Sequence, residues 1–257
     1  MGESTYGEQR APLAMAHRGG AGLGAENTLD AFERSYALGL RYFETDVRVI
    51  ADGTCVAFHD ATLDRVAGRP GRVRDMTPRE LHTHDIPTLE QVLCAFPDAR
   101  FAVDVKEAAA IGPLSRVLHG TNAAHRVCAA GAWDGWLARL RHETGPELTT
   151  ALGWRGLGSL LACASAGATP PWWHTAGRFA HVPWRLAVRS GSRLADQAHA
   201  LGVRVVVWTV NQPAQMHRVL DSGLDGIITD RPDLLREVLI ARGVWQPPYV
   251  TASERDS

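Results

Sequence analysis

Two acidic residues separated by one position form a candidate cation site. Glu44 and Asp46 lie in RYFETDVRVI (41–50), whose apolar pattern predicts a buried strand. Side chains alternate across a strand, so both carboxylates face the same side. Adjacent carboxylates repel each other and resist burial, and a divalent cation relieves both effects. Oxygen ligands favour Mg²⁺ or Ca²⁺. Pairing of one carboxylate with Arg41 or Arg48 is the alternative.

A second pair with the same spacing, Asp104 and Lys106, lies in the predicted strand FAVDVK (101–106). Here too both side chains face one side of the strand. We expect Asp104 to be a third metal ligand and Lys106 to contact a phosphate group. Lys106 is the sole lysine among 27 basic residues, which favours a need for a compact ammonium group at this place. A surface ion pair, which contributes little to stability, is the alternative.

Two histidines at predicted strand ends are candidates for proton transfer. His17 comes before Arg18 at the end of LAMAH (13–17), and His59 comes before Asp60 after a predicted turn. An imidazole titrates near neutral pH, which suits a general acid or base. The chain has eleven histidines, so a structural role is the alternative for each of the two.

These side chains need a scaffold that gathers the ends of several strands. Strand and helix patterns alternate along the chain. The alternation is clearest in the C-terminal third, where each of the predicted strands 203–211 and 224–230 lies between two helical segments. Such alternation predicts a parallel sheet with helical crossovers. The length of 257 residues fits an eight-stranded (β/α)₈ TIM barrel, an α/β fold whose reactive residues collect at the carboxyl ends of the strands. Trp208 lies near such an end and is predicted to line the substrate pocket. A doubly wound open sheet is the alternative, but no G-x-G-x-x-G follows the first strand.

The predicted barrel is a single domain over residues 13–245, with a short hairpin insertion after the second strand. Residues 1–12 are polar and predict a flexible N-terminal arm, and residues 246–257 predict a flexible C-terminal tail.

Composition narrows the class of protein. The 27 basic and 28 acidic residues give a net charge of -1 without a basic stripe, which argues against a nucleic-acid partner. No apolar run is long enough to span a membrane, although transient membrane contact stays compatible with the sequence. The N-terminus lacks the apolar core of a signal peptide, and the four cysteines are widely separated. We therefore expect a cytoplasmic protein with reduced thiols.

Six motifs, taken in order, give the chain a recognisable pattern. They are AHRGGAGLGAENTLDAF, FETDV, AFHDATLDR, DVK, VWTVN and DGIITDRP. This series resembles the glycerophosphodiester phosphodiesterase family from about Leu13 to Leu239. The resemblance implies a (β/α)₈ barrel that hydrolyses glycerophosphodiesters, a class of small molecules, to glycerol 3-phosphate and an alcohol with the help of a divalent cation.

The resemblance also implies roles for individual residues. His17 and His59 match the catalytic histidines, Arg18 matches the family's phosphate-binding arginine, and Glu44 and Asp46 match the Glu-x-Asp of the metal site. The pair of Asp104 and Lys106 matches a Glu-x-Lys, and the aspartate is one methylene shorter than the usual glutamate.

Two other functions are compatible with the same residues. A lysophospholipase D would use this site on a lipid substrate and would need an apolar groove, which Trp172, Trp173, Trp184 and Trp208 are candidates to build. A non-catalytic barrel that binds phosphodiesters without hydrolysis is the other alternative, and only the change at Asp104 favours it.

Overall fold

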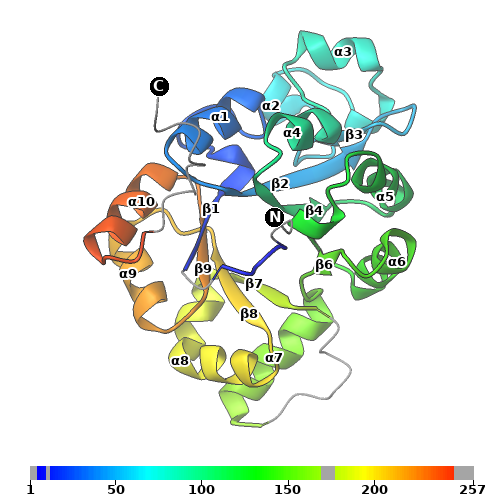
Figure 1. Ribbon diagram of the computed structural model, residues 1–257. Helices are drawn as coiled ribbons and strands as arrows, with labels where there is room; N and C mark the ends of the chain where they lie inside the picture. The colour runs from blue at the N-terminus through cyan, green and yellow to red at the C-terminus, as the bar shows by residue number, and fades with distance from the viewer. Residues whose placement is uncertain (1–4, 10–11, 169–176, 246–257) are drawn as a thin grey trace, which may run out of the picture.

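Eight parallel strands form a ring with helices outside it (Figure 1). The structure is a computed structural model in which residues 5–9, 12–168 and 177–245 are described. The strands are β1 (Leu13–Ala16), β2 (Tyr42–Val49), β3 (Cys55–Ala57), β4 (Arg100–Val105), β5 (Val127–Gly131), β6 (Thr149–Thr150), β7 (Phe179–Pro183), β8 (Arg204–Trp208) and β9 (Gly226–Thr229). Around the ring they follow the order β6-β5-β4-β2-β1-β9-β8-β7, and β3 pairs antiparallel with β2. A parallel bridge between Ala151 and Phe179 links the two ends of this series. The predicted barrel is confirmed.

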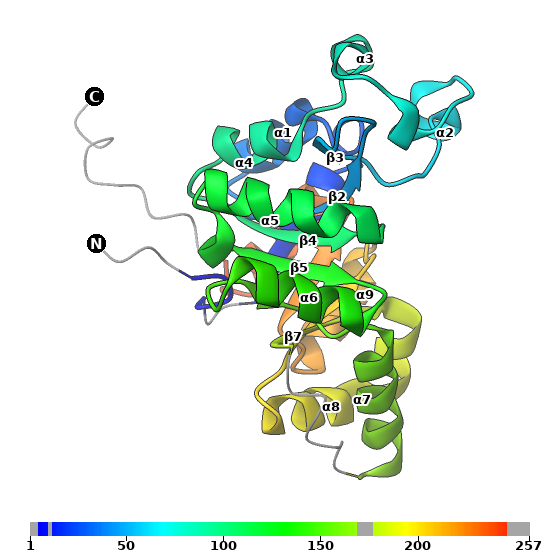
Figure 2. The same cartoon turned by 90° about the vertical axis from the view of Figure 1, so that its right-hand side faces the viewer.

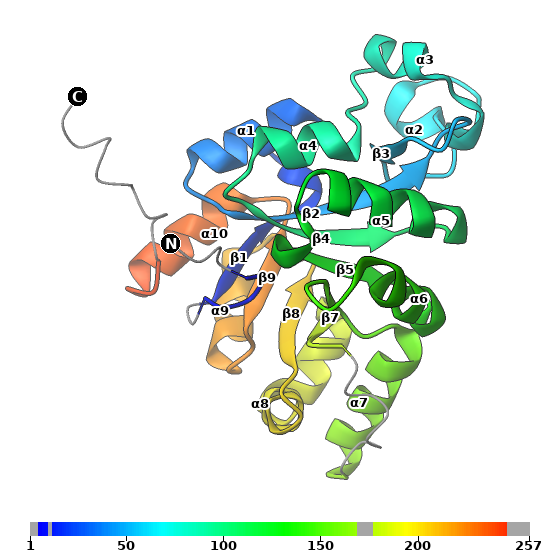
Figure 3. The same cartoon turned by 45° about the vertical axis from the view of Figure 1, so that its right-hand side comes forward.

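The helices cover the outer face of the strands (Figure 3). They are α1 (Leu29–Ala37), α2 (Asp64–Ala67), α3 (Pro78–Thr83), α4 (Leu89–Ala95), α5 (Ile111–Gly120), α6 (Asp134–Thr144), α7 (Trp154–Ala166), α8 (Trp184–Ala200), α9 (Pro213–Asp221) and α10 (Pro232–Ala241). Short 3₁₀ turns occupy His17–Gly19, Val73–Asp75, Ala108–Ala110 and Ala124–Arg126. None of the helices in the described ranges has the length and apolar character needed to cross a bilayer.

The register between β2 and β4 places acidic residues beside one another. Glu44 pairs with Ala102, and Asp46 pairs directly with Asp104. Side chains of alternate residues point to the same face of a strand, so the predicted carboxylates share the inner face near the carboxyl ends. Small and apolar side chains, including Met15 and Ile228, fill the barrel interior below them.

The amino end of the barrel is closed by part of the N-terminal segment. Tyr6 is buried and makes edge-to-face contacts with Tyr42 and Phe179, at ring-centroid distances of 5.4 and 5.1 Å. The backbone N–H of Tyr6 also donates to the carbonyl of His125. Residues 5–9, which lie within the segment predicted as a flexible arm, therefore pack against the barrel. The predicted tail over 246–257 lies outside the described residues.

The chain between β3 and α4 projects from the carboxyl-end side of β2, where α2 and α3 stand apart from the main ring of helices (Figure 2). This excursion has its own small apolar cluster, which includes Phe58, Leu63 and Met76. Such a cluster holds the segment in place without help from the barrel interior. It therefore fixes the loop that carries His59.

Some predicted element boundaries differ from the structure. The apolar pattern over 192–202 predicts a helix, whereas α8 begins earlier, at Trp184, and has a non-helical residue at Gly191. Of the two residues that could cap the start of α1, Asn27 and Thr28, it is Thr28 that does so, since its hydroxyl accepts the N–H of Ala31. The position of Asp230 just before the last helix predicts that it caps this helix, and that prediction is wrong because its carboxylate contacts His17 inside the barrel mouth.

Candidate active site

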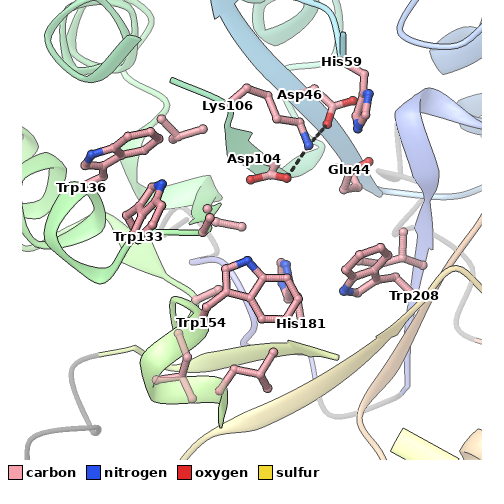
Figure 4. Close-up of a pocket in the computed structure, with 18 of the residues that line it drawn as sticks. Glu44, Asp46, His59, Asp104, Lys106, Trp133, Trp136, Trp154, His181 and Trp208 are labelled. Carbon is pink, nitrogen blue, oxygen red and sulfur yellow. Dashed lines mark hydrogen bonds and ion pairs between the residues drawn. The ribbon is translucent and has the colours of Figure 1, made fainter. Parts of the chain in front are cut away.

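A pocket of about 350 Å³ opens at the carboxyl ends of the strands, and one side of it is strongly polar (Figure 4). Every side chain that the sequence predicted for the site lines this pocket. These residues are His17, Arg18, Glu44, Asp46, His59, Asp104, Lys106 and Trp208. They come from the ends of β1, β2, β4 and β8 and from the loop after β3, so the barrel closure brings them together.

Glu44 is the buried carboxylate at the centre of the polar side. Its Oε2 accepts the backbone N–H of Arg18 at 3.1 Å and lies 3.8 Å from Nε2 of His17. Burial, followed by the negative charge of Asp46, raises the pKa of Glu44 to about 7. The ionised form of Glu44 is therefore disfavoured, and a further positive charge beside the carboxylate would stabilise it.

Lys106 joins the other two carboxylates. Its ammonium Nζ lies 2.8 Å from Oδ1 of Asp46 and 2.6 Å from Oδ2 of Asp104. Burial raises the pKa of Asp46, but Lys106 and other donors, including Asn27 with Nδ2 3.0 Å from Oδ2, more than offset this and lower it. Burial likewise lowers the pKa of Lys106, and the two carboxylates outweigh that effect, so the pKa is raised. The ammonium is fully charged at neutral pH.

His17 is held by a carboxylate from the far end of the chain. Its Nδ1 lies 2.6 Å from Oδ1 of Asp230, and Asp230 is fixed in turn by Asn211, whose Nδ2 donates to Oδ2 at 2.7 Å. Burial raises the pKa of Asp230, but His17 more than offsets this, so the pKa is lowered and the group is ionised. A carboxylate only accepts, so Nδ1 of His17 must carry the proton. For His17, burial lowers the pKa, and Asp230 and Glu44 together raise it above its usual value.

His59 is held in the same way from the opposite side. Its Nδ1 lies 2.6 Å from Oδ1 of Asp60. Arg65 donates to Oδ2 of Asp60 at 2.6 Å and makes two contacts of 2.7 Å with Glu26. The hydrogen bond from Arg65 is the main reason that the pKa of Asp60 falls to about 2. Both histidines therefore use Nδ1 for orientation and leave Nε2 for chemistry.

Arg18 sits in a left-handed backbone conformation, with φ of 49°. This conformation is costly for a non-glycine residue and is typical of functional sites. It turns the backbone N–H toward Glu44, while the guanidinium contacts Glu26 at 2.9 Å and lies 3.4 Å from Asp46. A planar, multiply donating cation is thereby fixed at the pocket wall.

The donor chemistry fits a hard divalent cation. Glu44, Asp46 and Asp104 offer only oxygen ligands, and Glu44 is buried beside the negative charge of Asp46. Their present arrangement is looser than a metal centre, since within residues 5–9, 12–168 and 177–245 no three Asp, Glu, His or Cys side chains converge as one. Asp104 instead contacts the ammonium of Lys106.

Comparison with known proteins gives the chain its family. The family model for "Glycerophosphoryl diester phosphodiesterase family" matches residues 17–234, which is most of the chain. The chain belongs to the glycerophosphoryl diester phosphodiesterase family. A protein of Mycobacterium tuberculosis named "Probable glycerophosphodiester phosphodiesterase 2" is 39% identical, with 91% of this chain and 92% of the relative covered. A glycerophosphodiester phosphodiesterase of Caldanaerobacter subterraneus is 30% identical, covering 87% of this chain and 96% of the relative.

Solved structures of glycerophosphodiester phosphodiesterases share the fold. The enzyme from Thermotoga maritima superposes with a TM-score of 0.71 at 24% identity, over 90% of this chain and 100% of that one. A phosphodiesterase of Oleispira antarctica, solved in complex with the product sn-glycerol-3-phosphate, has a TM-score of 0.70 at 20% identity, over 90% and 97% of the two chains.

The pocket of this family member also contains residues that the sequence did not single out for it. His181 lies at the base of the pocket, and burial lowers its pKa to about 4, so it is neutral. The tryptophans at the pocket also differ from those expected. Trp208 lines it, whereas Trp184 packs against the outer core. Trp172 and Trp173 lie outside the described residues.

The tryptophans that do line the pocket, besides Trp208, lie at the starts of the helices that follow β5 and β6. They are Trp133, Trp136 and Trp154. Trp133 precedes α6, Trp136 lies in its first turn and Trp154 is the first residue of α7, and apolar periodicity does not show which residues at a helix start face a pocket. Asn27 and Arg65 were also missed as parts of the site, although both fall within the motifs that carry the resemblance.

Proposed function

We propose that the protein hydrolyses glycerophosphodiesters to sn-glycerol 3-phosphate and an alcohol. The observation that carries this proposal is that two histidines of one pocket are each held by a carboxylate. His17 contacts Asp230, and His59 contacts Asp60. Two imidazoles that are each oriented through Nδ1 suit an acid and a base acting on the same phosphodiester. The names of the relatives from Mycobacterium tuberculosis and Caldanaerobacter subterraneus support the same reaction.

A divalent cation, Mg²⁺ or Ca²⁺, is part of the proposal. Glu44, Asp46 and Asp104 would hold it through oxygen ligands at the polar side of the pocket. When bound, the ion supplies positive charge that neutralises the charge developing on the phosphate oxygens.

The cationic side chains orient the phosphate. Arg18 has a planar fork that matches phosphate oxygens, and Lys106 adds a compact charge next to it. Both cations already lie against carboxylates of the pocket, so they are held in place before a substrate arrives. Preorganised charge of this kind stabilises a transition state without reorganisation at the moment of reaction.

The two histidines transfer protons in two steps. In the first, one imidazole takes the proton of the glycerol hydroxyl beside the phosphate, and that oxygen attacks phosphorus. The other imidazole protonates the departing alcohol, which leaves a cyclic phosphate. In the second step, water opens the ring with the two roles exchanged. The tethered hydroxyl lowers the entropic cost of attack. The positions of His17 and His59 on separate loops of one pocket support this division of roles.

Incubation of the purified protein with glycerophosphocholine and Mg²⁺ tests the proposal. We expect equal amounts of sn-glycerol 3-phosphate and choline, measured by enzymatic assay of both products. Release of phosphocholine and glycerol would mean that the other ester bond is cleaved, and no release would contradict the proposed reaction.

A further inference from the structure

His181 is a third histidine of the pocket, and the proposed reaction gives it no role. It lies in β7, two residues after Phe179, whose ring belongs to the barrel interior. Alternate residues of a strand share one face, so the imidazole also points into the barrel. Figure 4 shows it on the side of the pocket opposite Glu44 and Asp104. A polar side chain is thereby placed across the pocket from the charged residues.

Nε2 of His181 is a buried polar atom without a hydrogen-bond partner. Among the pocket residues that the structure describes, Nε of Arg18 is the only other such side-chain atom, and it lies 3.4 Å from a carboxylate oxygen of Asp46. The residue paired with His181 on β8 is Val206, which is buried and apolar. Buried polar atoms are nearly always paired, so an unpaired one in a pocket indicates a partner on the ligand.

The surroundings of His181 do not suit proton transfer. Burial lowers its pKa to about 4, although the charge of Asp104 partly opposes this effect. The imidazole is therefore a weak base at neutral pH. His17 and His59 are each oriented by a carboxylate, whereas no carboxylate in the described part of the chain hydrogen-bonds to Nε2 of His181.

A neutral imidazole fits a hydroxyl group better than a phosphate group. One ring nitrogen donates and the other accepts, and a hydroxyl can pair with Nε2 in either tautomer because it is both donor and acceptor. A phosphate oxygen needs a donor and gains most from positive charge. Arg18 and Lys106 already offer that charge at the polar side of the pocket. The partner that Nε2 lacks is therefore a hydroxyl group of the substrate.

The depth of the pocket distinguishes between the two ends of a glycerophosphodiester. Trp133 and Trp154 line the pocket with 62% and 52% of their surface exposed, whereas Nε2 of His181 is buried. The alcohol that leaves must reach solvent, so we expect it near the exposed tryptophans. The glycerol then occupies the deeper part. Its carbon chain carries the terminal hydroxyl away from the phosphate and toward the wall that holds His181.

We propose that His181 is a specificity-determining residue whose Nε2 hydrogen-bonds to the terminal hydroxyl of the substrate glycerol. The inference rests on the proposed function and deepens it, because it assigns a residue to the glycerol end of the substrate. In the free protein, solvent in the pocket can serve Nε2. A bound substrate that lacks the hydroxyl displaces this solvent and leaves Nε2 unpaired. Sites built to hydrogen-bond a hydroxyl reject analogues without it for this reason.

The kinetic test compares glycerophosphocholine with 2-hydroxypropyl phosphocholine. The analogue keeps the attacking hydroxyl beside the phosphate and has a methyl group in place of the terminal CH₂OH. Wild-type protein should show a kcat/KM at least about tenfold higher for glycerophosphocholine. His181→Phe keeps a ring and removes both nitrogens, so the ratio of the two kcat/KM values should fall toward one. His181→Gln restores a donor and an acceptor and should keep a preference for glycerophosphocholine.

This ratio separates recognition from a structural effect. Damage to the pocket lowers both rates together and leaves the ratio unchanged, so an unchanged ratio in His181→Phe would overturn the inference. His142→Phe makes the same change at an exposed position of α6, outside the pocket, and is the matched control. It should keep the wild-type ratio.

Binding separates this inference from the proposed function, because it needs no turnover. Calorimetry of the wild type with Mg²⁺ should give a Kd at least about tenfold lower for sn-glycerol 3-phosphate than for 2-hydroxypropyl phosphate of the same configuration, and His181→Phe should bind both equally. This preference without hydrolysis of either diester would support the role of His181 and contradict the reaction. Hydrolysis of both diesters, with equal affinity of the wild type for the two ligands, would support the reaction and overturn the inference.

Discussion

Nδ1 of His17 and Oδ1 of Asp230 lie 2.6 Å apart, although the two residues are separated by 213 positions in the sequence. They meet because β1 and β9 are neighbouring parallel strands, with Ala16 paired to Thr229 in register. The contact places the imidazole proton on Nδ1 and leaves Nε2 near Glu44. Asp230 is therefore expected to orient His17 for proton transfer.

Asp230→Asn should lower kcat by about 10²–10⁴-fold while the protein stays folded, because an amide no longer selects the same imidazole tautomer. Steady-state hydrolysis of glycerophosphocholine and circular dichroism measure the two effects. Asp221→Asn changes the same side chain at an exposed ion pair with Arg242 and is the matched control. Wild-type kcat in Asp230→Asn would remove the carboxylate from the mechanism.

Asp104→Glu should tighten the binding of Mg²⁺. The aspartate contacts Lys106 at 2.6 Å, and the longer side chain gives the carboxylate the additional reach of one methylene toward Glu44 and Asp46. We expect the Mg²⁺ concentration for half-maximal activity to fall by about tenfold, the scale on which single groups around a metal alter its affinity. Asp98→Glu, an exposed carboxylate paired with Arg41, should leave this concentration unchanged. A higher Mg²⁺ requirement in Asp104→Glu would argue against Asp104 as a ligand.

Arg65→Ala should lower the thermal stability in a pH-dependent way. Arg65 contacts Asp60 and Glu26, whose pKa values are both lowered in the folded protein, that of Asp60 to about 2. A carboxyl group with a lowered folded pKa adds stability above its unfolded pKa, about 4, and loses that contribution as the pH falls through the folded value. The Tm of the variant should thus lie about 2–4 °C below that of the wild type near neutral pH, the shift that roughly 1 kcal/mol produces at this chain length.

Between about pH 4 and pH 2 this Tm difference should shrink, because both carboxyl groups become protonated and lose their attraction to Arg65. Differential scanning fluorimetry across this range measures it. An equal Tm difference at neutral pH and at pH 2 would show that the arginine stabilises the loop by packing rather than by charge.

Most of the polar half of the pocket was predictable from local patterns. The alternation of side chains in a strand places Glu44 with Asp46 and Asp104 with Lys106, and parallel strands bring their carboxyl ends together. These rules need only the strand assignments, and those assignments hold in the structure to within a few residues.

The remaining features depend on contacts between distant segments. The use of Asp230 as the partner of His17 follows from barrel closure, while the local pattern, Asp230 before Pro232, indicates a helix cap. The hydrogen bonds that Asp134, at the start of α6, accepts from Gly153 and Arg155, at the start of α7, likewise join two segments with no shared pattern. A local sequence pattern does not indicate contacts between distant segments, so the sequence singled out Trp208 for the pocket but not Trp133, Trp136 and Trp154.

The dependence of hydrolysis on a divalent cation is the most direct test of the site as a whole. Release of sn-glycerol 3-phosphate from glycerophosphocholine is followed in one protein sample before chelation, after EDTA treatment and dialysis, and after Mg²⁺ or Ca²⁺ is added back. Because Glu44, Asp46 and Asp104 are proposed to act through the cation, activity should disappear with the chelator and return with the metal. Full activity of the chelated protein would contradict the account.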